Sequence, residues 1–161
     1  MTKDLCGWNI KNFRNISKMK IKLKQFDLSL PVPAYKTSGA AAFDLYARIA
    51  VTIPAQSVGY VPLNVALQLP ENHWAMVSAR SSLHKRGLML ANGIGVGDYD
   101  YRGDGDEYLA ALFNFKSEPV VIDRGERLVQ MIIMSREKVE FELVTEFGTA
   151  DRGGFGSTGL K

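Results

Sequence analysis

A stretch between two apolar runs, residues 91–114, concentrates side chains that could carry chemistry. Glycine there alternates with Ile94 and Val96, and a strand of this kind exposes its backbone to a ligand that approaches closely. Asn92 and Asp98 add an amide and a carboxylate, so the stretch is a candidate ligand site. Because Asp, Gly and Tyr are also common in turns, a solvated hairpin tip is the alternative interpretation.

The run DYDYRG, residues 98–103, resembles the start of a calcium-binding loop. Arg102 occupies the third ligand position of such a loop, and Leu109 stands where a bidentate Glu is required. The identity of these two residues therefore argues against an EF-hand.

The run GFGSTG, residues 154–159, matches the glycine fingerprint of dinucleotide-binding proteins. Only Leu160 and Lys161 follow it, so no helix N-terminus is expected to hold a pyrophosphate, and the Rossmann interpretation fails on context. Two hypotheses remain for this tail. It is a disordered end, as Gly-rich termini often are, or it is a clasp for phosphate and base in which Arg152 and Phe155 take part.

The composition limits the classes of protein to which the chain can belong. A chain of 161 residues with 46% hydrophobic content suits one globular domain with a sizeable core. No apolar run is long enough to span a membrane, and the N-terminus lacks a compact secretory segment, so we expect a cytoplasmic protein without membrane association. Cys6 is the only cysteine and the chain has two histidines, which argues against a zinc site and favours oxygen ligands for any metal.

The net charge of +3 is concentrated at one end of the chain. Residues 1–24 sum to +6 and residues 25–161 to −3, so a basic face across the domain, and with it stable binding to nucleic acid, is not expected. A strand pattern begins only at Met19. We therefore interpret residues 1–18 as a leader or extension that is poorly ordered.

From Met19 onward, apolar and polar residues alternate with a period of two, which predicts strands. The alternation is clear in residues 19–26, 61–69 and 139–143, and residues 128–134 read as a strand buried on both faces. Pro, Gly and Asn turn signals interrupt these runs at short intervals. The pattern predicts an all-β sandwich or barrel, with one short helix at most, in residues 81–87.

Five short segments resemble, in order, the motif set of the trimeric dUTP diphosphatases, the dUTPases. The segments are SGAAAFDLYA (38–47), ARSSLHKRG (79–87), NGIGVGDYDYRG (92–103), RGERLVQMI (124–132) and RGGFGSTG (152–159). Each alone is weak, but five in the family's order on an all-β background form a specific signal. The resemblance implies a jelly-roll-like fold and a homotrimer with active sites at subunit boundaries. It also implies a β domain over residues 19–147 and a flexible C-terminal arm, residues 148–161, that closes over the site.

The reaction that the resemblance implies is magnesium-dependent hydrolysis of dUTP to dUMP and pyrophosphate. Asp98 matches the family's base, which would orient and deprotonate a water for in-line attack on the α-phosphorus. Asn92, with backbone groups of the strand around Gly95, would read the edge of uracil. Tyr101 would pack flat on the deoxyribose and exclude a 2′-hydroxyl.

The resemblance also assigns residues to the triphosphate and the metal. Phosphate contacts are expected from Arg80, Ser81, Ser82 and Gln130, and Asp44 would reach Mg²⁺ only through water, because this ion keeps most of its waters. In the tail, Phe155 would stack on uracil, while Arg152 and the segment Gly156, Ser157 and Thr158 would close over the nucleotide and hold its γ-phosphate.

The chain departs from the family pattern in three places. Gly97 stands where a bulky aliphatic residue commonly precedes the base, and its backbone freedom could loosen Asp98. Asp104–Asp106 form an insertion after the YRG segment. Arg152 and Phe155 are three residues apart, whereas five is common in the family, so a simultaneous contact of both with the nucleotide is in question. These departures keep two alternatives open, a dCTP deaminase-like enzyme of the same fold and a catalytically weak nucleotide-binding regulatory protein.

Overall fold

The computed structural model describes residues 19–153, which form eleven short strands and one 3₁₀ helix. The elements are β1 (Lys22–Gln25), β2 (Phe43–Leu45), β3 (Val51–Ile53), β4 (Val58–Pro62), β5 (Val65–Gln68), β6 (His73–Ala79), η1 (Leu83–Arg86), β7 (Leu88–Leu90), β8 (Gly95–Gly97), β9 (Leu109–Asn114), β10 (Val120–Ile122) and β11 (Val129–Ser135). The all-β class is confirmed, and η1 is the single helical segment among these residues, as the sequence predicted.

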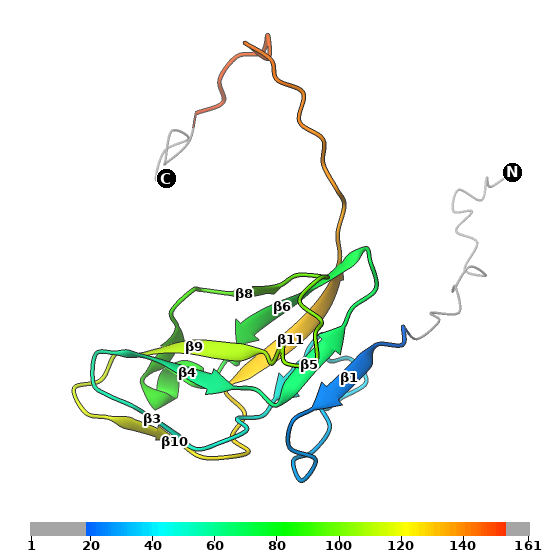
Figure 1. Ribbon diagram of the computed structural model, residues 1–161. Coiled ribbons are helices and arrows are strands. Elements are labelled where there is room, and N and C mark those ends of the chain that lie inside the picture. Colours follow the sequence, from blue (N-terminus) through cyan, green and yellow to red (C-terminus); the bar gives the residue numbers. More distant parts are fainter. Residues whose placement is uncertain (1–18, 154–161) are drawn as a thin grey trace, which may run out of the picture.

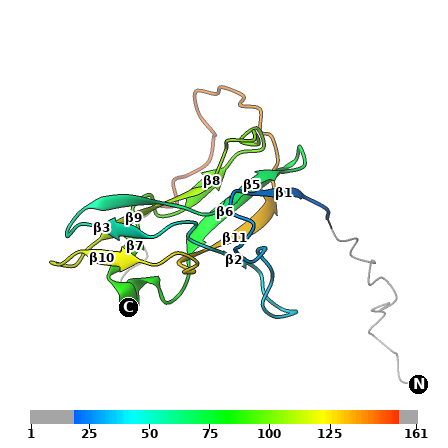
Figure 2. The same ribbon diagram turned by 60° about the horizontal axis from the view of Figure 1, so that its bottom comes forward.

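The strands pair antiparallel into four sheets. The largest has the order β2-β11-β6-β8, a three-stranded sheet has the order β4-β9-β7, and the pairs β1-β5 and β10-β3 complete the fold. Figures 1 and 2 show the sheets packed as one body, with β3 and β10 together at one end. Side chains from all four sheets form one apolar core, whose largest fully buried members include Leu45, Ile53, Leu63, Leu88, Leu112, Ile122 and Met131.

The alternating run at residues 61–69 is not one strand but contributes to two, β4 and β5, with a break at Asn64. Asn64 has a φ of 67°, a left-handed conformation that Asn tolerates better than most residues. Its buried side chain accepts a hydrogen bond from the Asp27 N–H at 2.6 Å and donates one to the Asp27 carbonyl at 3.0 Å. The alternation itself carries no sign of this break, because Asn64 falls on a polar position.

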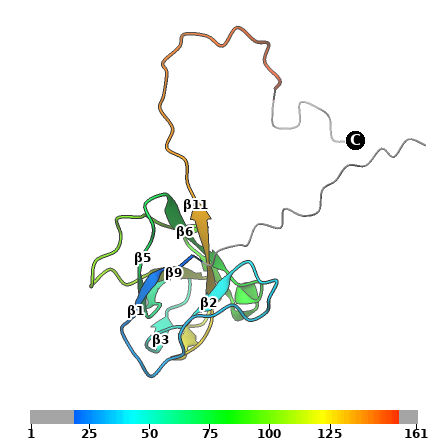
Figure 3. The same cartoon turned by 90° about the vertical axis from the view of Figure 1, so that its right-hand side faces the viewer.

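After β11 the chain leaves the body, and residues 136–153 contain no strand (Figures 1 and 3). The strand predicted at residues 139–143 is therefore wrong for the single chain. Its apolar side chains are exposed instead, Phe141 at 83% and Leu143 at 96%. A strand needs a neighbouring edge to complete its hydrogen bonds, and within residues 19–153 this segment pairs with none.

Some of the predictions fall on parts of the chain that the structure does not describe. The leader at residues 1–18 lies outside the described residues, as do Phe155, Gly156, Ser157 and Thr158 of the tail. Between residues 19 and 153, no helix has both the length and the apolar character needed to cross a membrane.

Candidate active site

One pocket, of about 310 Å³, brings together four of the residues expected to contact substrate. We call it the Asp98 pocket; it is lined by Val77, Asn92, Gly95, Val96, Gly97, Asp98, Tyr101, Tyr108 and Leu109. Its floor is β8, which pairs with β6 on one side and is the edge strand of its sheet. The other backbone edge of β8 is therefore free to bond a ligand.

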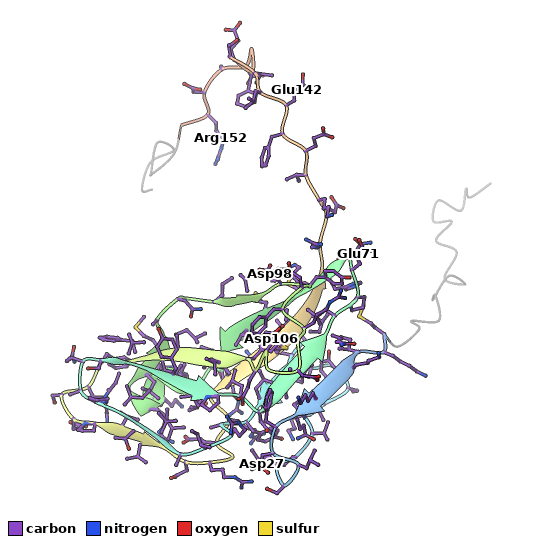
Figure 4. The ribbon with its side chains drawn as sticks, viewed as in Figure 1. Asp27, Glu71, Asp98, Asp106, Glu142 and Arg152 are labelled. Carbon is purple, nitrogen blue, oxygen red and sulfur yellow. The ribbon has the colours of Figure 1, made fainter. Side chains whose placement is uncertain are left out.

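Asp98 follows β8 directly and begins a turn in which the Tyr101 N–H donates to the Asp98 carbonyl at 3.2 Å. The Asp98 side chain is exposed, and among the residues that the structure describes its carboxylate has no hydrogen bond or ion pair. Figure 4 shows Asp98 at the border of the body from which the arm departs. A carboxylate in this position is accessible to water and to a ligand.

Tyr101 is fixed at two points. Its hydroxyl donates to the Glu107 carbonyl at 2.9 Å, and its ring meets the ring of Tyr108 edge to face, at 5.4 Å between centroids and 86° between planes. Partial burial is the largest cause that raises the pKa of Tyr101. Tyr101 as a whole remains 39% exposed, which leaves a surface for a ligand.

Tyr108 is a pocket residue that sequence reasoning missed. It is only 5% exposed, and its hydroxyl has no hydrogen-bond partner within the described part of the chain. Burial, the largest cause, raises the pKa of Tyr108 to about 12, so the phenol is neutral at physiological pH. Its signal in the sequence is an aromatic residue directly before β9, the strand that follows the glycine-rich stretch.

Gly97 and Tyr108 are packed against each other. A Cβ atom added at Gly97 would lie 2.4 Å from the Tyr108 hydroxyl oxygen and 2.5 Å from Cε1, closer than any real contact. The sequence suggested that Gly97 loosens the backbone before Asp98. The structure gives a different reason for this glycine, because the phenol ring occupies the space of its missing side chain.

The inserted residues Asp104–Asp106 form a tight turn that is attached to β1. The Asp106 carboxylate accepts a hydrogen bond from the Gly103 N–H at 2.6 Å, and Lys24 donates to the Asp104 carbonyl at 2.7 Å. The insertion therefore extends the loop toward β1, and it contributes no side chain to the Asp98 pocket.

A second group of predicted residues surrounds the buried carboxylate of Asp44 on β2. Arg80 Nε lies 2.9 Å from Oδ1, and Arg127 Nη1 lies 2.9 Å from Oδ2. Gln130 of β11 is opposite Asp44 in the sheet and donates to the Ala79 carbonyl at 3.2 Å. Arg127 was missed in the sequence, although it stands in the segment 124–132 that pointed to Gln130.

Beside this carboxylate lies a pocket of about 410 Å³ that is rich in cations. Four basic side chains, Arg80, Lys85, Arg86 and Arg127, line it together with Ser82, and Glu126 is the only carboxylate among the residues that form it. Glu126 forms an ion pair with Arg86. We call this pocket of about 410 Å³ the basic pocket; its charge suits a polyanion. Ser81 is exposed in a neighbouring pocket that also includes Arg80.

The two pockets lie far apart on one chain. In the sheet, Gly97 of β8 is opposite Ala75 of β6. From this point, Arg80 lies five residues away in one direction along the strands, and Asp98 lies one residue away in the opposite direction. At about 3.3 Å per residue, Asp98 and Arg80 are separated by about 20 Å along the sheet. Arg152 lies on the arm, away from both (Figure 4). One chain therefore does not unite the predicted base with the predicted phosphate contacts.

The donor groups do not form a protein cage for a metal. Within residues 19–153, no three Asp, Glu, His or Cys side chains are grouped so that they could hold an ion. Both oxygens of Asp44 already face arginines. The chemistry of these groups fits a Mg²⁺ ion that is carried mainly by substrate oxygens and water.

Comparison with known proteins decides the family. The family model described as dUTPase matches residues 29–159, which is most of the chain. The chain belongs to the dUTPase family. The deoxyuridine 5′-triphosphate nucleotidohydrolase of Desulfitobacterium hafniense is 41% identical over 152 residues, which cover 91% of this chain and 99% of the relative. The enzyme of the same name from Dictyoglomus turgidum is 36% identical over 149 residues, 88% of this chain and 99% of the relative.

Solved structures of dUTPases have the same fold. The dUTPase of Streptococcus mutans superposes with a TM-score of 0.68 at 27% identity, and the match covers 74% of this chain and 98% of that one. The dUTPase of Staphylococcus bacteriophage 80alpha has a TM-score of 0.77 at 20% identity, and covers 89% and 100% of the two chains. The similarity to the phage dUTPase shows only that the two chains share a fold.

Proposed function

We propose that this dUTPase-family chain hydrolyses dUTP to dUMP and pyrophosphate in the presence of Mg²⁺, through attack of water on the α-phosphorus. The observation that carries the proposal is the Asp98 pocket, where an unpaired carboxylate stands at the end of a glycine-rich edge strand and beside an exposed tyrosine ring. A cytoplasmic location and the lack of stable nucleic-acid binding stay predictions.

The base would be read by the free edge of β8 together with the Asn92 amide. A site that pairs every donor and acceptor of uracil leaves buried groups unpaired when cytosine enters, which is worth on the order of 10⁴ in discrimination. Close approach of the base is aided by Gly95, which has no side chain in the pocket. The exposed surface of Tyr101 would pack against the deoxyribose.

Asp98 would hold the attacking water and accept its proton. A carboxylate is a weak base at neutral pH, so a large part of its effect would come from the orientation of the water toward the phosphorus. The Asp98 carboxylate is free of other partners in the described residues, which leaves its lone pairs available for this water.

The triphosphate would be bound by Arg80 and Ser82 of the basic pocket, with Ser81 of the neighbouring pocket and Gln130 of β11 as further contacts. Mg²⁺ bound to the phosphate oxygens would supply charge neutralisation. Asp44 would accept hydrogen bonds from magnesium-bound water, since a carboxylate has about four lone-pair sites and its two arginines use only part of them. The arginines in turn would hold the Asp44 carboxylate in a fixed orientation.

The site would be shared between chains of a homotrimer. The separation of about 20 Å between Asp98 and Arg80, at strand spacing, is too long for one triphosphate to span. The Asp98 pocket of one copy therefore needs the basic pocket of another. Closed cyclic symmetry gives every copy the same two contacts, and three equivalent sites result.

The segment that follows β11, from residue 136 through the arm, supplies a second reason for an assembly. Val139, Phe141 and Leu143 alternate with exposed glutamates and have no partner in residues 19–153. An apolar groove of about 590 Å³ lies between β1, β2 and the segment at Pro33–Tyr35, and β1 pairs on one side only. We infer that the arm of one copy adds a strand beside β1 of a neighbour and carries residues 152–158 to that neighbour's site.

Pyrophosphate release tests the activity. With Mg²⁺, dUTP should be cleaved in strong preference to dTTP, dCTP and UTP. Ammonia release from dCTP would indicate a deaminase, and binding of dUTP without turnover would indicate a regulatory protein.

Mixed assemblies test the shared site. Asp98→Asn and Arg80→Gln should each be inactive as pure proteins. After joint denaturation and refolding, an equimolar mixture should regain roughly a quarter of the wild-type activity, the share of random subunit pairs that join an intact Asp98 to an intact Arg80. No regain in a mixture that has formed trimers would contradict a site shared between chains.

A further inference from the structure

Tyr108 stands directly behind Tyr101 in the Asp98 pocket, as the edge-to-face contact of their rings shows. Tyr108 is buried, whereas Tyr101 is partly exposed to the pocket. The ring of Tyr108 also occupies the space next to Gly97 that a side chain at this position would need. Tyr108, which directly precedes β9, therefore packs behind the wall of the pocket beside β8.

The other contacts of Tyr101 hold only its ends. The backbone N–H bonds to the Asp98 carbonyl, and the hydroxyl donates to the Glu107 carbonyl. Both of these contacts act at the ends of the residue, whereas Tyr108 contacts the ring itself. Because the Tyr108 ring is closely packed against Gly97, it resists a displacement of the Tyr101 ring toward it.

We propose that Tyr108 is a positioning residue that sets the selectivity for deoxyribose over ribose by supporting Tyr101 from behind. This inference rests on the proposed function, in which Tyr101 packs against the sugar. With the support in place, the Tyr101 ring lies where a 2′-hydroxyl would have to go. Without it, the ring retreats into the vacated space and a ribonucleotide fits. A side chain at Gly97 would displace the supporting ring.

The test compares two substitutions of the same residue. Tyr108→Phe keeps the ring, whereas Tyr108→Val removes it. We expect the ratio of kcat/KM for dUTP to kcat/KM for UTP to fall at least about tenfold in Tyr108→Val, as for the loss of one shape contact, and to stay near the wild-type ratio in Tyr108→Phe. Tyr60→Val, at an exposed tyrosine of β4 outside the pocket, is the matched control and should not change the ratio.

A double variant separates selectivity from a general loss of packing. Gly97→Val combined with Tyr108→Val fills the same space from β8, so it should restore much of the ratio and also fold where Tyr108→Val alone is unstable. An unchanged ratio in folded Tyr108→Val would overturn the proposal. So would an equal loss in Tyr108→Phe, because the hydroxyl rather than the ring would then be responsible, or a double variant no more selective than Tyr108→Val.

Binding of the monophosphates distinguishes failure of this inference from failure of the proposed function. Calorimetric dissociation constants of dUMP and UMP report sugar selectivity without any turnover. A wild-type chain that prefers dUMP, together with a Tyr108→Val chain that prefers it equally, would overturn the role of Tyr108 alone. A wild-type chain that binds neither would overturn both.

Discussion

Glu107 accepts hydrogen bonds from Arg48 with both carboxylate oxygens, from Nε at 2.8 Å and from Nη2 at 2.9 Å. Its Oε1 also accepts the Asn64 N–H at 2.8 Å. This carboxylate is the main cause that raises the pKa of Arg48. Since Glu107 directly precedes Tyr108 and its carbonyl binds the Tyr101 hydroxyl, the pair fixes the returning half of the loop that forms the Asp98 pocket.

We therefore expect Glu107→Gln to destabilise the protein by about 1–3 kcal/mol, the usual cost when a hydrogen bond to a charged group is lost. The affinity for dUMP should fall as well, because the Glu107 carbonyl that accepts from the Tyr101 hydroxyl is held less firmly in place. Denaturant unfolding and calorimetry measure the two effects. Glu118→Gln is the matched control, since its ion pair with Lys116 is exposed, and it should change neither quantity.

The hydroxyl of Tyr108, which has no hydrogen-bond partner in the described residues, should lower the free energy of unfolding. Removal of a buried hydroxyl that has no partner should stabilise the chain by about 1–3 kcal/mol, so Tyr108→Phe should raise Tm. A lower Tm would show that the hydroxyl has a partner in the assembled protein.

Tyr108 should also make the free energy of unfolding depend on pH. The pKa of Tyr108 in the folded chain is about 12, above its ordinary value of 10.0, so the unfolded chain loses this proton first as pH rises. Its contribution to the free energy of unfolding is complete below pH 10 and should be lost between about pH 10 and 12. The difference between wild type and Tyr108→Phe in denaturant melts across this range isolates that contribution. A difference independent of pH would contradict it.

Asp44 provides a test of the basic pocket that leaves the Asp98 pocket untouched. Asp44→Asn removes the charge between Arg80 and Arg127, so the two guanidinium groups repel each other and lose their orientation. We expect kcat/KM for dUTP to fall at least about tenfold, as for loss of a charge-assisted hydrogen bond, with little change in the dissociation constant of dUMP. An equal loss of dUMP affinity would mean that Asp44 supports the whole fold rather than the phosphate contacts.

Removal of residues 152–161 should lower turnover much more than stability. Arg152 and Gly153, the described part of this segment, are exposed and belong to no strand, so these two residues add few contacts to the core of their own chain. Steady-state kinetics and Tm of the truncated protein check this. A large decrease in Tm would show that these residues hold the assembly together.

Periodicity predicted the fold class because strands such as β9 and β10 bury one face, and turn residues separate the strands. It could not predict the break at Asn64, which depends on a hydrogen bond to a residue 37 positions away. It also predicted a strand at residues 139–143. The alternation is present there, but no pairing strand lies within the described part of the single chain. Local alternation reports that a face will be buried, not which chain buries it.

The sequence also predicted some residues of the candidate site and missed others. Asn92, Gly95, Asp98 and Tyr101 are close in sequence, and the structure brings them into one pocket. Tyr108 was missed because its role depends on contact with Gly97 across the loop, and Arg127 because its partner Asp44 lies 83 positions away. The assignments of individual roles, including those of the tail, stay predictions until they are measured.

Single-turnover pyrophosphate release from dUTP with Mg²⁺ determines whether Asp98 acts as the base in dUTP hydrolysis. Asp98→Asn keeps the size of the side chain and removes its basicity. If Asp98 is the base, the rate of the chemical step should fall by a factor of at least roughly 10², with nearly unchanged affinity for dUTP. A rate near that of the wild type would contradict it.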